Sequence, residues 1–115
     1  MATTGLHGPH ALTAQGIDAV FKSASPGAYA LGRQTAQGYY VDYVGRSDSD
    51  LPARLKQWAA TGRYPHFKAG YLQTAQAAFE YECRLYHDFG GGTKRLDNDI
   101  HPARPQGSNW LCPHC

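Results

Sequence analysis

The chain has 115 residues, of which 42% are hydrophobic and 17% are charged. This length suits one domain with a single modest core, and this balance is that of a globular chain, which excludes an intrinsically disordered one. The net charge of +2 does not by itself indicate nucleic-acid binding, and no apolar run approaches the ~20 residues of a membrane-spanning helix.

The first 25 residues are expected to form an N-terminal extension. Residues 1–11 carry glycine and histidine and are expected to be loose, whereas a short helix is expected from about Leu12 to Lys22. The extension has neither the basic start nor the apolar centre of a secretory signal. We therefore expect a cytoplasmic protein, and secretion as an effector by a signal-independent route stays open.

Three strands are predicted. GAYALGR, residues 27–33, follows a turn signal, and YYVDYV, residues 39–44, is rich in β-branched and aromatic residues. Because only a short polar connection separates these two segments, they are expected to pair as an antiparallel hairpin. HFKAGYL, residues 66–72, alternates well enough to be the third strand.

Two longer helices are predicted around the third strand. The first runs from the acidic stretch 48–50 to about Thr61, because Asp and Ser cap helix N-termini and Gly62 suits the position after a helix. The second covers residues 75–89, between a threonine cap and three glycines. The order β-β-α-β-α favours a small α/β (α+β) domain with a mostly antiparallel three-stranded sheet flanked by helices.

The second of these helices has a carboxylate on its packing face. Its apolar stripe consists of Ala75, Ala78, Phe79 and Tyr86. Glu82 falls within this stripe, and burying a carboxylate is costly unless a partner or a function requires it. Either Glu82 pairs with an arginine at the edge of the stripe, or a functional site needs it there.

Five separated elements occur in an order that a known family shares. They are, in chain order, Gly27-Ala28-Tyr29, Tyr43-Val44-Gly45, Arg54, Glu82 in an alanine-rich helix, and Asn98. With them the chain resembles the GIY-YIG nuclease domain, which is found in phage homing endonucleases, some restriction enzymes and the incision subunit of bacterial excision repair. The resemblance implies a GIY-YIG-like core over residues 26–98, followed by an irregular tail over residues 99–115.

The resemblance implies a metal-dependent endonuclease that hydrolyses phosphodiester bonds, of DNA more than of RNA. Glu82 would hold one catalytic Mg²⁺ or Mn²⁺, and Arg54 would bind the scissile phosphate through its planar donor fork. Tyr29 would accept a proton from the attacking water. Tyr43 would line the same site and hydrogen-bond water or phosphate, and Asn98 would complete the catalytic set.

The biological role and the residues that would contact the nucleic-acid backbone stay open. Arg46, Lys56 and Arg63 could extend a basic track for the nucleic-acid backbone, although a solvated helix face explains them equally well. As an enzyme, the chain could be a toxin, a defence nuclease or a repair nuclease. The alternative is a catalytically silent nucleic-acid-binding or protein-binding module on the same fold.

The cysteines predict a second, structural metal site. The terminal CPHC has the form of a zinc knuckle, but it supplies only two of the four ligands that a structural zinc needs. Cys83 and His87 are four residues apart, so one helix face can present both. The expected set is Cys83, His87, Cys112 and Cys115, with His101 or His114 as rivals for the histidine position. Without zinc, Cys83 would be a small core residue.

Overall fold

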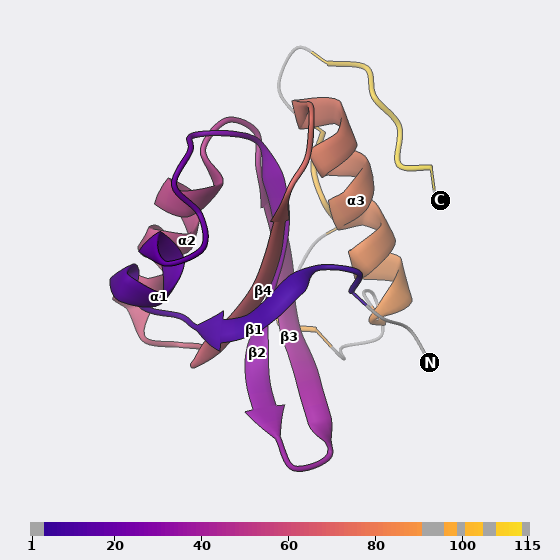
Figure 1. Cartoon of the computed structure of the whole chain (residues 1–115). Coiled ribbons are helices and arrows are strands. Elements are labelled where there is room, and N and C mark those ends of the chain that lie inside the picture. The colour runs from indigo at the N-terminus through magenta and orange to yellow at the C-terminus, as the bar shows by residue number, and fades with distance from the viewer. Residues whose placement is uncertain (1–3, 91–95, 99–100, 105–107, 114–115) are drawn as a thin grey trace.

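The computed structural model describes residues 4–90, 96–98, 101–104 and 108–113 (Figure 1). Its elements, in chain order, are β1 (His7–Ala11), α1 (Ala14–Asp18), β2 (Gly27–Thr35), β3 (Gly38–Ser47), α2 (Leu51–Thr61), β4 (His66–Tyr71) and α3 (Ala75–Asp88). Within the described ranges, no helix is long and apolar enough to cross a membrane.

The strands form one four-stranded sheet in the order β1-β4-β2-β3, and all of its strand pairs are antiparallel. Helices α1 and α2 cover one face of the sheet, and α3 covers the other (Figure 1). The central strand β2 is therefore buried on both faces, and its alternating side chains enter two separate cores.

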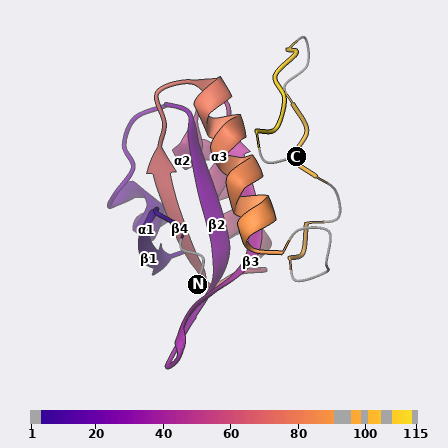
Figure 2. The same cartoon turned by 90° about the vertical axis from the view of Figure 1, so that its right-hand side faces the viewer.

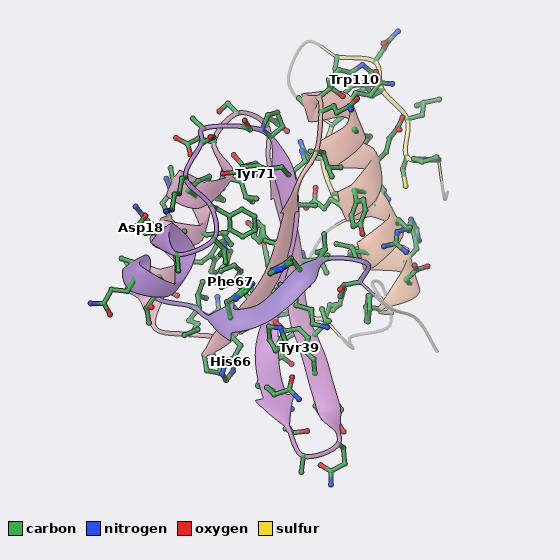
Figure 3. The ribbon with its side chains drawn as sticks, viewed as in Figure 1. Asp18, Tyr39, His66, Phe67, Tyr71 and Trp110 are labelled. Atoms are coloured by element: carbon green, nitrogen blue, oxygen red, sulfur yellow. The ribbon has the colours of Figure 1, made fainter. Side chains whose placement is uncertain are left out.

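The two cores lie on opposite sides of β2. Tyr29 and Leu31 pack toward α1 and α2, together with Phe67, which lies between the sheet and these helices (Figure 3). Ala28 and Ala30 pack toward α3. The first core also contains Leu12, Ile17 and Phe21, so the N-terminal segment packs against the rest of the chain; the division of the chain near residues 25 and 98 stays a prediction.

The predicted α+β class and the mostly antiparallel sheet are confirmed, but the prediction of three strands is wrong. Residues 7–11, expected to be loose, form the edge strand β1, which pairs with β4. Its sequence, HGPHA, has no β-branched residue, and Pro9 is tolerated because an edge strand leaves one row of backbone groups without a strand partner. The helix expected over residues 12–22 is shorter and covers only Ala14–Asp18.

The long helices begin and end where side-chain chemistry predicts. Asp50 accepts a hydrogen bond from the Ala53 backbone N–H, which caps α2, and Gly62 ends that helix with φ +67°. Thr74 caps α3 in the same way. These caps fix where α2 and α3 start relative to the sheet, and therefore which of their side chains meet across it.

Candidate active site

The first feature of the site is the contact between Tyr29 and Gly45, which lie directly opposite each other in the β2–β3 pair. The tyrosine is only 2% exposed. A Cβ atom at Gly45 would lie 2.4 Å from Cζ and Oη of Tyr29. The glycine of the Tyr43-Val44-Gly45 motif is therefore required, because the ring of Tyr29 lies against it.

We expect Gly45→Ala to destabilise the fold by about 1–3 kcal/mol, the usual cost of overpacking. The added methyl would push Tyr29 out of its position between β3 and α2. Gly70→Ala is the matched control, because its Cβ would lie 3.3 Å from the flexible side chain of Leu6. Urea unfolding of both variants measures the difference, and an unchanged midpoint for Gly45→Ala would show that the ring does not depend on the glycine.

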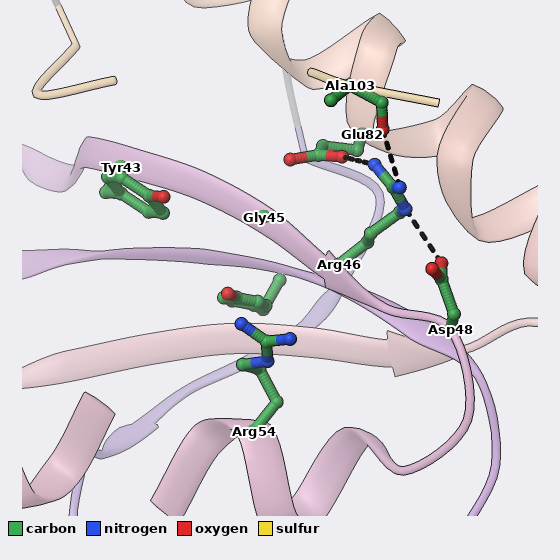
Figure 4. A pocket seen from close by; sticks show the side chains of 8 residues that line it. Tyr43, Gly45, Arg46, Asp48, Arg54, Glu82 and Ala103 are labelled. Carbon is green, nitrogen blue, oxygen red and sulfur yellow. Dashed lines mark hydrogen bonds and ion pairs between the residues drawn. The ribbon is translucent and has the colours of Figure 1, made fainter. Parts of the chain in front are cut away.

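A cavity of about 220 Å³ opens beside this contact. It receives Tyr29 from β2, Tyr43 from β3, Arg54 from α2 and Glu82 from α3 (Figure 4). The other lining residues are Gly45, Arg46, Asp48 and Ala103. Four of the five expected catalytic side chains thus converge on one space from four different elements.

Arg46 lies at the centre of a polar network on one wall of the cavity. Its Nη1 donates to Oε1 of Glu82 at 2.6 Å, its Nε to Oδ1 of Asp48 at 2.8 Å, and its Nη2 to the carbonyl of Ala103 at 2.6 Å (Figure 4). The side chains of Arg46 and Glu82 are only 13% and 10% exposed. The buried carboxylate of α3 therefore has an arginine partner, Arg46, which comes from β3 and not from α2.

The two members of this pair respond differently to burial. Burial raises the pKa of Glu82, although the hydrogen bond from Arg46 and the positive charges of Arg46 and Arg54 oppose the rise. Burial also acts to lower the pKa of Arg46, but its bonds to Asp48 and Glu82 outweigh this and raise it. Because arginine stays protonated at every accessible pH, Glu82 is the member whose ionisation affects stability.

We expect the stability of the wild type relative to Glu82→Gln to fall as the pH rises. A carboxyl group with a raised folded-state pKa stabilises the native state fully below its ordinary pKa of about 4.3, and this contribution is lost as the pH rises through the raised value. Glutamine has no such titration, and Arg46 keeps Asp48 and Ala103 as partners. Denaturant unfolding of both proteins, from below pH ~4.3 to above the raised pKa of Glu82, tests this expectation. A stability of the wild type relative to Glu82→Gln that increases with pH would contradict it.

The hydroxyl of Tyr29 is held from one side by α2. Trp58 donates its indole N–H to Tyr29 Oη at 2.8 Å. Burial raises the pKa of Tyr29, and the neighbouring Tyr43 and Glu82 add to the rise, while Trp58 and Arg54 oppose it. The neutral phenol is therefore the form present near neutral pH, with its oxygen accepting from Trp58 and its own proton left to donate.

Arg54 and Tyr43 face the cavity from two other sides. Within the described ranges the Arg54 guanidinium makes no hydrogen bond or ion pair, and it points from α2 toward the cavity (Figure 4). Tyr43 packs its ring against Trp58, with ring centroids 4.6 Å apart. Trp58 therefore supports both tyrosines, and Arg54 offers its donors to whatever enters the cavity.

Asn98, the fifth expected residue, does not line the cavity. Its Oδ1 accepts from the backbone N–H of Val44 at 2.9 Å, and its Nδ2 donates to the carbonyl of the same residue at 2.8 Å. The Asn98 side-chain amide thus pairs with the backbone of Val44 in β3 as a neighbouring strand would, next to Gly45. This position makes Asn98 a positioning residue for β3.

Of the three residues expected to form a basic track, Arg46 lies at the cavity and the other two lie elsewhere. Arg46 lies in its wall, paired as described above. Lys56 makes an ion pair with Asp18 of α1 at 2.7 Å, beside a different pocket. Arg63 lies over the ring of Tyr64, with its Cζ 5.4 Å from the ring centroid. The track along the nucleic-acid backbone stays a prediction.

Sequence reasoning missed the site roles of Arg46, Trp58 and Ala103. Trp58 could have been found, because it lies four residues after Arg54 and so shares a helix face with it. Arg46 directly follows the second motif, but its role depends on Glu82, 36 residues further along the chain. No sequence signal marks the carbonyl of Ala103.

The donor set of the cavity fits a hard divalent cation. Glu82 uses Oε1 for Arg46, and its second carboxylate oxygen points away from that arginine (Figure 4). Asp48 contributes another carboxylate to the same wall. Mg²⁺ prefers oxygen ligands and is commonly held by one or two carboxylates while it keeps several waters. Glu82 is the group that would hold it, since Asp48 lies on the other side of Arg46 and is bonded to that arginine (Figure 4).

The residues expected to bind zinc are brought together only in part. Donor atoms of Cys83, His101 and Cys112 lie within 4.8 Å of one another. The histidine in this group is thus the rival His101, while His87 lies beside it, with the two Nε2 atoms 3.2 Å apart. Cys115 and His114 lie outside the described residues.

A scan of the chain against protein-family models, and searches of curated proteins and of solved structures, found no match. Any functional assignment therefore depends on the geometry of the cavity and on the chemistry of its side chains.

Proposed function

We propose that this chain is a metal-dependent endonuclease that hydrolyses phosphodiester bonds, as its resemblance to GIY-YIG nucleases implies. The observation that carries the proposal is the convergence of Tyr29, Tyr43, Arg54 and Glu82 on one polar cavity. These residues are far apart in the sequence, and a packing role alone gives no reason for them to share a space that is open to solvent. DNA is the substrate we favour.

Arg54 is the phosphate-binding group in this proposal. Its guanidinium has a planar fork of N–H donors that can bond two phosphate oxygens at once, and this pairing is stronger and more directional than that of an ammonium group. The same positive charge stabilises the negative charge that develops on the phosphate during attack. In the part of the chain that the structure describes, this guanidinium makes no hydrogen bond or ion pair, unlike that of Arg46, so its donors can turn to a phosphate.

Tyr29 is the group that contacts the attacking water. Because Trp58 donates to its oxygen and its pKa is raised, the phenol meets the water as a neutral donor. It can take the proton of that water only if its own proton leaves in the same step, for example to a phosphate oxygen. Tyr43 lines the cavity beside it and can orient the water or the phosphate.

Glu82 is the metal-holding group. A divalent cation bound there would supply positive charge to a phosphate oxygen, as in other metal-dependent hydrolases. Arg46 holds one oxygen of Glu82 and so fixes the direction of the other. Asp48 and Ala103 in turn hold Arg46.

The proposal is tested by incubating the purified protein with supercoiled plasmid DNA and Mg²⁺, beside a sample with EDTA and a sample with single-stranded RNA. We expect nicked and then linear DNA only where the metal is available. Plasmid that stays supercoiled with Mg²⁺ and with Mn²⁺, at protein concentrations that bind the DNA, would contradict the proposal.

The alternative, a catalytically silent binding module on the same fold, has one observation in its favour. Glu82 already has an ion-pair partner in Arg46, and such a pair can serve the fold alone. The module would bind nucleic acid or protein without needing the carboxylate. A Glu82→Gln protein that is indistinguishable from the wild type in every binding and cleavage assay would favour this alternative.

A further inference from the structure

A second group of potential metal ligands lies outside the cavity, between α3 and the C-terminal segment. Cys83 comes from α3, His101 from residues 101–104 and Cys112 from residues 108–113, and their donor atoms lie within 4.8 Å of one another. Cys83 is buried, and the other two are partly buried. Three soft or borderline donors from three separate segments are thus enclosed in one place.

The hydrogen bonding of His101 fixes which of its ring nitrogens is suited to bind a metal. Its Nδ1 lies 2.9 Å from the carbonyl oxygen of Pro102. Because a carbonyl only accepts, Nδ1 carries the proton and Nε2 carries the lone pair. Metal-binding histidines commonly donate their other ring N–H to a backbone carbonyl in this way, which fixes the ring orientation.

A fourth donor is near. The Nε2 atoms of His87 and His101 are 3.2 Å apart, at hydrogen-bond distance, but His87 lies outside the group of described residues whose donor atoms are all within 4.8 Å of one another. Its ring would have to turn toward the two cysteines to become the fourth ligand. Cys115 is the rival donor, because it follows Cys112 in a C-x₂-C pattern that is typical of zinc sites.

We propose that Cys83, His101 and Cys112 bind a structural zinc ion, with His87 or Cys115 as the fourth ligand. The donor types favour zinc over Mg²⁺ or Ca²⁺, which prefer oxygen. Four protein ligands leave no open position, so the ion serves the fold and takes no part in hydrolysis.

The zinc ion would anchor the C-terminal segment, residues 101–104 and 108–113, to α3, in addition to the apolar contacts that these residues already make. This segment runs beside α3 (Figure 2), where Trp110 packs on Phe79 with ring centroids 6.5 Å apart. Leu111, by contrast, is 76% exposed. Because Pro102 is buried but the other described residues of this segment are exposed or only partly buried, a metal shared with α3 would add to the order of the segment.

The proposed zinc site is also linked to the candidate active site through neighbouring residues in the chain. Ala103, whose carbonyl accepts from Arg46, lies two residues after His101. Cys83 directly follows Glu82 on α3. The ion would therefore hold the segment that supplies one of the three partners of Arg46, without itself facing the cavity.

The test is the metal content of the full-length protein, expressed with zinc in the medium and purified without chelators. We expect about one zinc per chain by elemental analysis. Cys112→Ser and His101→Ala should each lower the zinc content at least tenfold, whereas His7→Asn, on β1, should leave it unchanged. Because Cys112 and His101 lie in the C-terminal segment, circular dichroism of these variants should keep the signal of the folded domain.

Cobalt substitution identifies the fourth ligand, because the thiolate-to-cobalt absorption increases with the number of thiolates. Two thiolates, with metal lost in His87→Ala, would support the site with His87. Three thiolates, with metal lost in Cys115→Ser, would support it with Cys115. Chelation should expose the segment around Trp110 to protease while the sheet stays folded.

Three results would overturn the proposal. They are a protein that contains no zinc after expression with zinc, a zinc content that Cys112→Ser and His101→Ala leave unchanged, and a mass that shows Cys83 and Cys112 joined as a disulfide. None of these results depends on nuclease activity, so the zinc site and the proposed function can fail separately.

Discussion

Replacing Glu82 by glutamine is expected to lower the rate of Mg²⁺-dependent DNA cleavage by more than about 100-fold. Loss of a residue that merely orients a metal ligand already costs about 10–100-fold, and Glu82 is proposed to be the ligand itself. Glutamine keeps the size of the side chain and an oxygen that can accept from Arg46. The loss would therefore come from the missing charge rather than from a collapsed cavity.

The matched control for this substitution is Glu80→Gln on the same helix. Glu80 does not line the cavity, and it accepts a hydrogen bond from Gln76 on α3. It should cleave at the wild-type rate, as measured by single-turnover nicking of plasmid DNA. If Glu80→Gln lost activity while Glu82→Gln kept it, the proposed metal-holding residue would be the wrong one.

The second large effect is expected at Arg54. Arg54→Ala should lower kcat/KM by about 10²–10³-fold, the usual loss when one donor that stabilises the transition state is removed. Arg54→Lys should be nearly as damaging, because lysine keeps the charge but loses the two-pronged donor fork. A charge effect alone would instead leave Arg54→Lys close to the wild type.

Arg33→Ala is the control for the arginine substitutions. Arg33 is exposed, lies over the ring of Tyr40 and does not line the cavity. The three proteins should be compared in kcat and in KM at several salt concentrations. If Arg33→Ala and Arg54→Ala lost equal activity, and a small decrease in salt restored it in both, the role of Arg54 would be only the general attraction of DNA.

The parts of the fold that depend on local chemistry could be predicted from the sequence. The hairpin of β2 and β3 follows from its β-branched and aromatic residues, and α2 and α3 follow from their caps and apolar stripes. Strand β1 could not be predicted in this way. HGPHA has no strand pattern, and it is extended only because the edge of β4 offers backbone partners.

The same distinction applies to the candidate site, where residues of local motifs could be predicted and contacts between distant segments could not. Tyr29, Tyr43, Arg54 and Glu82 could be named because they belong to motifs in a recognisable order. The pairing of Arg46 with Glu82 could not, since it depends on how α3 crosses the sheet. The positions of Asn98 and His101 depend on the path of the irregular C-terminal segment, for which periodicity gives no information.

The measurement that tests the central claim most directly compares DNA binding and DNA cleavage by the wild type and by Glu82→Gln. The dissociation constant for a short duplex is measured in EDTA, and single-turnover cleavage is then started with Mg²⁺ at saturating protein. Our account predicts similar dissociation constants for the two proteins, rapid cleavage by the wild type and almost none by the variant. A wild type that binds the duplex but leaves it intact with Mg²⁺, or a variant that cleaves at the wild-type rate, would contradict it.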